Sequence, residues 1–164
     1  MKRLLIAMLC LVMLLTCVSC GNDGLTEYTD EAGITIRLPE GFVEFEQQGF
    51  TYSLYKDDVF FFSMRESFSD LEEKYELRAD ASLVEYAQLV ARGNGIDAQL
   101  VVKSKDDAYF TYSSTSNEGE VHYFYAAFKK GSDAFWLCQF ACPADKYESM
   151  KENFSDWSEA IKVK

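Results

Sequence analysis

Histidine and basic residues are scarce in this sequence, and each shortage excludes a class of function. His122 is the only histidine, which excludes metal clusters built from several histidines and relays that need two. Lys and Arg number 16 against 27 Asp and Glu, and the formal net charge is −11. Nucleic acid is therefore not expected as a partner, because phosphate contact depends on clustered Lys and Arg.

Residues 25–164 contain no linker rich in Pro, Gly or Ser, no tract of one charge and no internal repeat. We therefore expect a single domain over this range. Apolar residues make up 48% of the chain and aromatics 15%. This composition argues against intrinsic disorder, because disordered chains are poor in core-forming side chains.

The N-terminus has the pattern of a targeting segment. Lys2 and Arg3 precede an uninterrupted apolar run, Leu4–Leu15. A membrane-spanning helix needs about 20 apolar residues, so this shorter run indicates a signal peptide over residues 1–19.

The end of that segment, Val18-Ser19-Cys20-Gly21, resembles the bacterial lipobox. The resemblance implies cleavage before Cys20 and acylation of its sulfur. A second frame ends at Cys17, after Leu14-Leu15-Thr16, and stays open as an alternative. With Cys20 as the anchor, residues 20–24 form a tether that reaches less than about 20 Å. We expect a lipid-anchored protein on the extracytoplasmic face of the cell membrane.

Short turn signals divide the remaining chain into strands that suit antiparallel neighbours. The expected strands are Leu25–Thr29, Ile34–Leu38, Phe50–Tyr55, Val59–Arg65, Ala98–Lys103, Ala108–Ser113, Glu120–Phe128 and Ala134–Ala141.

Two helices interrupt this series. Ser82-Leu83-Val84-Glu85 is a capping box, which predicts a helix that ends near Gly93. Pro143 is favoured at a first helical position and predicts the start of the second. Apolar residues at helical spacing continue from there to Ile161. The charged segment Phe68–Asp80 is expected to be a loop with at most one helical turn.

Both faces of Glu120–Phe128 and of Ala134–Ala141 are apolar. An antiparallel sheet with one wet face would instead alternate apolar and polar residues. These strands are therefore expected at the centre of the sheet, with a helix covering each face. The predicted fold is α+β, an α/β/α sandwich around a central antiparallel sheet.

The segment Ile34–Phe42, which ends Leu-Pro-Glu-Gly-Phe, resembles the opening of PsbP-like domains. The order of strands and helices after it is similar too. The family includes the photosystem PsbP subunit, the Ran-binding Mog protein and DcrB-type bacterial lipoproteins. The resemblance implies a PsbP-like fold and a binding or assembly role without a shared catalytic site. It transfers no functional residue to this chain.

No residue pattern predicts a catalytic, metal or cofactor site. His122 is expected to have a structural role within its strand. Gly93-Asn94-Gly95 follows a helix instead of opening one, so it is expected to stop the helix. Three carboxylate pairs are expected in solvated turns and on the surface, namely Asp57-Asp58, Glu72-Glu73 and Asp106-Asp107.

Two aromatic runs, Phe60–Phe62 and Tyr123–Tyr125, have two explanations. Successive side chains of a strand point to opposite faces, so a buried sheet accounts for them. The alternative is that they line a ligand pocket.

Cys138 and Cys142 are the two cysteines expected within the folded domain. If the strand stays extended, their Cα atoms are roughly 13 Å apart, and a disulfide needs less than about 7 Å. No mutual bridge is expected. Cys138 should be buried beside Trp136 and Phe140. Cys142 is expected at the start of the last helix, where amide groups lower a thiol pKa.

Together these patterns favour a membrane-anchored extracytoplasmic lipoprotein that acts as a binding or assembly module and is not an enzyme. An envelope protein is the expected partner. Two alternatives stay open. A small-ligand carrier would have a closed apolar cavity. A carboxylate-dependent envelope hydrolase would have two carboxylates about 5–9 Å apart in a cleft.

Overall fold

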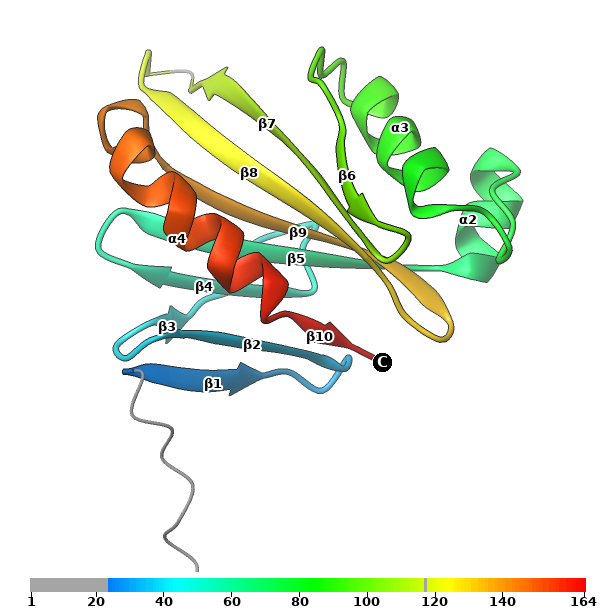
Figure 1. Ribbon diagram of the computed structural model, residues 1–164, viewed down its shortest axis with the longest axis horizontal. Coiled ribbons are helices and arrows are strands. Elements are labelled where there is room, and N and C mark those ends of the chain that lie inside the picture. The colour runs from blue at the N-terminus through cyan, green and yellow to red at the C-terminus, as the bar shows by residue number, and fades with distance from the viewer. Residues whose placement is uncertain (1–23, 117) are drawn as a thin grey trace, which may run out of the picture.

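The computed structural model describes residues 24–116 and 118–164, which form two antiparallel sheets and three α-helices (Figure 1). The predicted signal peptide, Cys17 and Cys20 lie outside these residues. Within them, no helix is both long and apolar enough to cross a membrane.

The strands are β1 (Leu25–Thr29), β2 (Ile34–Pro39), β3 (Val43–Glu44), β4 (Tyr52–Lys56), β5 (Val59–Ser67), β6 (Val101–Ser104), β7 (Asp107–Thr115), β8 (Val121–Lys130), β9 (Ala134–Pro143) and β10 (Lys162–Val163). The helices are α2 (Phe68–Tyr75), α3 (Leu83–Gly93) and α4 (Tyr147–Glu159), with a 3-10 turn at Ala144–Lys146.

The larger sheet has seven strands in the order β3-β4-β5-β9-β8-β7-β6 among the described residues. β9 lies in the middle and pairs antiparallel with β5 on one side and β8 on the other. This confirms the predicted central position of residues 120–128 and 134–141.

Both faces of β9 are covered, because its residues from Ala134 to Cys142 are all buried. Trp136, Cys138 and Phe140 point into one core, while Phe135 and Leu137 point into another. Full burial of such an aliphatic or aromatic side chain contributes about 1.5–3 kcal/mol. β8 is less completely covered than predicted, since its first four residues are half-buried or exposed.

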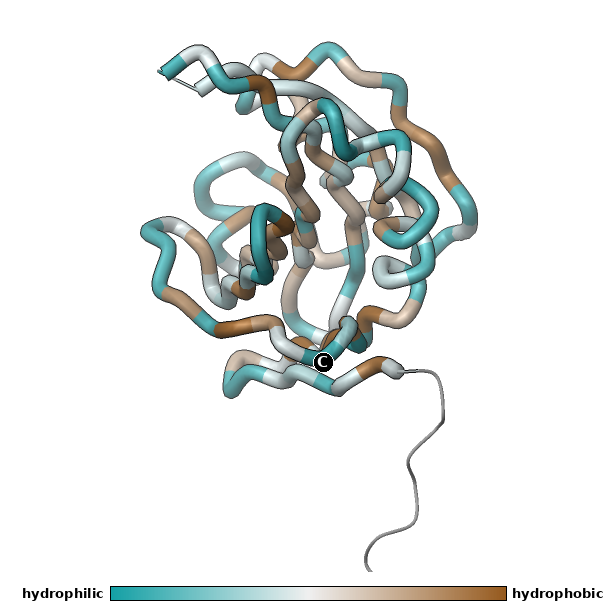
Figure 2. Tube along the Cα trace, turned by 90° about the vertical axis from the view of Figure 1, so that its left-hand side faces the viewer, coloured by the Kyte–Doolittle hydropathy of each residue, from teal (hydrophilic) through white to brown (hydrophobic). Residues whose placement is uncertain are grey.

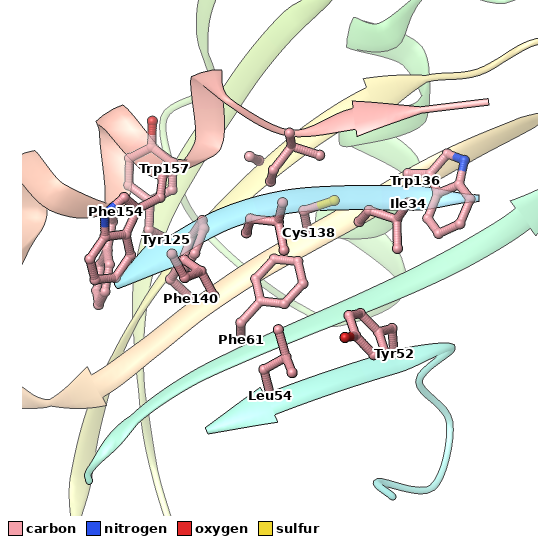
Figure 3. Packing of buried hydrophobic residues seen from close by; sticks show 14 of the residues in the cluster. Ile34, Tyr52, Leu54, Phe61, Tyr125, Trp136, Cys138, Phe140, Phe154 and Trp157 are labelled. Atoms are coloured by element: carbon pink, nitrogen blue, oxygen red, sulfur yellow. The ribbon is translucent and has the colours of Figure 1, made fainter. Parts of the chain in front are cut away.

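α4 and the small sheet cover one face of the large sheet, and α2 and α3 lie on the other. Figure 2 shows helical turns on both sides of the sheet. Figure 3 shows how Phe154 and Trp157 of α4 meet Phe140 on the first face, with Ile34 of β2 farther along it. The predicted α+β sandwich is confirmed.

The first hairpin does not join the large sheet, which differs from the predicted single sheet. β1, β2 and β10 form a separate three-stranded sheet. Ile34, Ile36 and Leu38 are fully buried and pack with the core beneath α4. β10 pairs Lys162 with Thr35, so the last strand lies beside the first hairpin.

The segment after β5 was predicted as a loop, and it contains α2. Ser67 caps this helix, because its hydroxyl accepts a hydrogen bond from the Asp70 N–H at 3.1 Å. Leu71 is its buried residue. One buried side chain in a charged helix gives too weak an apolar period to be found in the sequence.

The capping box of α3 is confirmed. The Ser82 hydroxyl accepts from the Glu85 N–H at 3.2 Å, and the Glu85 carboxylate accepts from the Ser82 N–H at 2.8 Å.

The predicted start of the last helix at Pro143 is wrong. β9 continues through Pro143, which has an extended backbone and lies opposite His122. α4 begins at Tyr147. Its predicted apolar stripe is confirmed, since Phe154, Trp157 and the following Ile161 are buried.

Candidate functional site

An open groove of about 1070 Å³ lies on the α2–α3 face of the large sheet. Strands β5, β9, β8 and β7 contribute to its floor, and α3 with the segment after it forms a wall. The groove exists because α2 and α3 pack over one part of this face and leave the rest uncovered.

Apolar and aromatic side chains of successive strands make the floor, among them Met64, Leu137 and Phe124. Tyr112 stacks on Phe124 with the ring centroids 4.8 Å apart. The buried Gln139 side chain donates a hydrogen bond from Nε2 to the Tyr112 hydroxyl at 2.8 Å. Burial raises the pKa of Tyr112, against the opposing effect of this hydrogen bond, so the phenol stays neutral at physiological pH.

The wall is the end of α3 and the residues after it, 93–97. Asn94 closes the helix, since its side-chain amide donates to the Val90 carbonyl at 2.8 Å. Gly95 has a φ of +64°, a region that disfavours residues with a Cβ. The predicted helix stop is therefore confirmed. The sequence pattern did not show that the same residues line a groove.

Glu66 and Asp97 are the charged residues found in the described lining. The Tyr86 hydroxyl donates to Glu66 Oε2 at 2.6 Å, which holds this carboxylate at the helical side of the groove. Tyr86 is fully buried and stacks on Phe135 with the ring centroids 4.6 Å apart. Burial, and then the charge of Glu66, raise the pKa of Tyr86 well above its ordinary value.

An aromatic cluster continues from the groove over β4 and β5. Phe50 lines the groove and lies over Phe62, with 4.8 Å between the ring centroids. The cluster consists of Phe45, Phe50, Tyr55, Phe60 and Phe62, joined by further ring contacts. Each member is half-buried or exposed.

The two explanations of the aromatic runs each account for part of them. Phe61 and Tyr125 are buried in the core beneath α4. Phe60 and Phe62 belong to the exposed aromatic cluster, and Phe124 lies in the groove. The Tyr123 ring stacks instead on Tyr147 of α4, on the opposite face of the sheet.

The lone histidine does not lie in the groove. His122 is half-buried at the start of β8, opposite Ser114 of β7 and Pro143 of β9. The part of the chain that the structure describes holds no group of three or more His, Cys, Asp or Glu residues suited to a metal ion.

The carboxylate pairs lie apart from the groove, and most follow the prediction. Glu72, Glu73, Asp57 and Asp106 are exposed. Asp58 accepts from Lys146, whose ammonium lowers the Asp58 pKa.

Asp107 departs from the predicted solvated turn. Its carboxylate lies 3.1 Å from the Lys129 ammonium, and the two side chains are 19% and 11% exposed. Asp107 thus belongs to a largely buried ion pair.

Burial decides the state of both thiols. Cys138 and Cys142 are free and fully buried, as predicted for Cys138. Burial raises the pKa of Cys138 to about 12 and that of Cys142 to about 11. The predicted low pKa and high reactivity of Cys142 are wrong, because β9 continues past it and carries it into the core.

No protein-family model matches the sequence, and no curated protein matches it. Among solved structures, the Ran-binding protein Mog1p of Saccharomyces cerevisiae matches with a TM-score of 0.53 and 12% identity, over 85% of this chain and 95% of Mog1p. A protein of Bacteroides thetaiotaomicron matches with a TM-score of 0.56 and 14% identity. That match covers 86% of this chain, which spans 49% of the Bacteroides protein.

Cyanobacterial PsbP (CyanoP) from Synechocystis also matches, with a TM-score of 0.40 and 15% identity, over 90% of this chain and 99% of CyanoP. The fold assignment rests on the higher-scoring Mog1p. At 12% identity that likeness shows the fold alone. The predicted Mog-type fold is therefore confirmed, whereas function has to be argued from the groove.

Proposed function

We propose that this protein is a lipid-anchored, extracytoplasmic binding module and that the groove is its binding surface. The observation that carries the proposal is the groove itself, about 1070 Å³ and open to solvent beside an exposed aromatic cluster. The exposed aromatic cluster that borders the groove favours an interaction site, because leaving apolar surface in water is unfavourable.

The groove is also preorganised. The Gln139–Tyr112 hydrogen bond fixes one ring of the floor, and the Tyr86–Glu66 hydrogen bond fixes a carboxylate beside it. A surface whose side chains are already ordered loses less entropy when it binds. This favours a specific site over an incidental hollow.

The place of the small sheet supports an orientation on the membrane. β1 begins at Leu25, and Figure 1 shows the small sheet at the bottom of the molecule and α3 near the top. An anchor at Cys20 would hold the small sheet within about 20 Å of the bilayer. The groove would then face away from the membrane, where a partner can reach it.

The fold is compatible with a binding role, since the structurally similar Mog1p is described as a Ran-binding protein. We do not propose the small-ligand carrier, because it predicts a closed cavity and the groove is open. Nor do we propose the hydrolase. No observation on the described groove residues favours it over a binding surface.

Site-specific photocrosslinking in living cells tests the proposal. A photoreactive phenylalanine analogue replaces Ser114 or Asp97, which are exposed and line the groove. Matched controls carry it at Asp106 or Glu152, which are exposed elsewhere. We expect both groove positions to form an adduct with the same envelope protein, and neither control to do so. Equal labelling at all four positions, or no adduct at either groove position, would refute the proposal.

A further inference from the structure

We infer that the occupant of the groove is a polypeptide segment of a partner protein that carries Lys or Arg beside apolar or aromatic residues. This inference rests on the proposed function, because it specifies the partner of the same groove.

The form of the groove favours a chain segment over a small molecule. The groove has a volume of about 1070 Å³ and is lined by residues of four strands and of the end of α3. It is open along the sheet. Small-molecule sites are clefts or cavities that bury most of the ligand's surface, which an open groove along a sheet does less completely. A peptide segment can cover an open surface while its own backbone stays partly solvated.

The charged side chains that line the groove favour a partner with cationic side chains. Glu66 and Asp97 line it, and the described lining includes no Lys, Arg or His. A smaller adjoining hollow of about 450 Å³ shares Phe50 with it and adds Glu44 and Glu46. The whole chain has a net charge of −11, which steers cationic partners toward it.

The aromatic rings add a second requirement. The stacked Tyr112 and Phe124 rings and the half-buried Phe50 and Phe62 rings offer flat apolar surfaces beside the carboxylates. Such rings bind apolar side chains, and a Lys or Arg cation is attracted to a ring face within about 6 Å. Nucleic acids and anionic lipid headgroups are disfavoured, because the charged side chains in the described lining are the carboxylates Glu66 and Asp97, which repel phosphates.

Selection from a random dodecapeptide library displayed on phage, against the full-length protein in detergent micelles, tests the inference. We expect the enriched peptides to combine Lys or Arg with aromatic or aliphatic residues. The affinity of a synthetic consensus peptide is then measured by calorimetry. Ser114→Trp, which places a bulky side chain at the exposed edge of the groove, should abolish the binding.

Charge-matched variants isolate the role of the two carboxylates. Glu66→Gln with Asp97→Asn removes the groove charges and leaves an oxygen to accept the Tyr86 hydroxyl. Asp106→Asn with Glu118→Gln removes the same charge from exposed positions elsewhere. We expect the first pair of substitutions to lower the affinity for the consensus peptide about tenfold, and the second pair to lower it less than about twofold.

Two outcomes would overturn the inference and leave the proposed function standing. One is enrichment of neutral or acidic peptides that Ser114→Trp excludes. The other is equal weakening of the consensus peptide's binding by both charge-matched pairs, which would show that Glu66 and Asp97 do not select a cationic segment. If no enriched peptide depends on the groove, both the inference and the proposed function fail.

Discussion

Burial controls the ionisation of Cys138 and Cys142, whose side chains both point from β9 into the core beneath α4. Their pKa values of about 12 and about 11 are raised because the interior disfavours a thiolate. The unfolded chain has no such burial, and its thiols ionise near the ordinary pKa of 9.0. Each thiol therefore contributes stability that is fully present below pH 9 and lost as the pH rises toward 11 or 12.

The free energy of unfolding should fall by about 1 kcal/mol per buried thiol between pH 8 and pH 10. Cys138→Ala and Cys142→Ala should each reduce this fall by about that amount. Denaturant unfolding at the two pH values measures it. An unchanged fall in both variants would show that the thiols are not the source.

Gly131, in the turn between β8 and β9, meets the C-terminal residue. A Cβ built at Gly131 would overlap the Lys164 carbonyl oxygen. Gly131→Ala should therefore lower stability by about 1–3 kcal/mol, because the C-terminal segment has to move. The measurement is the unfolding midpoint in denaturant.

Two variants serve as controls for Gly131→Ala. Gly93→Ala faces open space at the end of α3 and should leave stability unchanged or slightly raised. Deletion of Lys164 should remove most of the penalty of Gly131→Ala. A full penalty in the absence of Lys164 would contradict the contact.

Residue-scale predictions from sequence succeeded where strand alternation applies. Cys138, Trp136 and Phe140 were correctly expected to share a buried face. Cys142 was misplaced because the sequence gives no sign that β9 continues to Pro143. The role of Gln139 could not be foreseen either, since its partner Tyr112 is brought to it by β7 from elsewhere in the chain.

At the scale of elements, α3 depends on its capping box. Ser82→Ala removes the hydroxyl that accepts the Glu85 N–H, which should destabilise the fold by about 1 kcal/mol. Gln88→Ala, at an exposed position of the same helix, should change stability by less than about 0.5 kcal/mol. Thermal unfolding of the two variants checks this. An equal effect of both would mean that the cap contributes nothing.

Elements with a strong local signal were predicted well. The capping box identified α3, and the stripe through Phe154 and Trp157 identified α4. β10 has two residues and α2 has one buried side chain, so neither leaves a recognisable period. Their form depends on tertiary partners, such as β2 for β10.

At the scale of the whole molecule, the groove could not be predicted. Its floor combines residues far apart in sequence, such as Met64, Tyr112 and Leu137, and its depth depends on how far α2 and α3 extend over the sheet. The sequence predicted which strands lie at the centre of the sheet but not the order of the others. The sequence did show a high content of aromatic residues. The exposed ones lie in the groove and in the neighbouring aromatic cluster.

Anchoring is a property of the whole chain, and it remains a prediction. Cys20→Ala should leave the protein uncut or release it from membranes, because the sulfur that would carry the lipid is gone. Fractionation with metabolic fatty-acid labelling measures this. If labelling survives Cys20→Ala and vanishes in Cys17→Ala, the second lipobox frame is the correct one.

The central claim is that the groove is occupied in the native envelope, and hydroxyl-radical footprinting tests it most directly. The chain offers matched probes: Met64 and Tyr112 line the groove, whereas the half-buried Met150 and Tyr147 lie on α4. Native membranes and purified full-length protein are oxidised in parallel. We predict that Met64 and Tyr112 are less oxidised in native membranes, with Met150 and Tyr147 unchanged. Equal oxidation of Met64 and Tyr112 in both preparations would contradict the account.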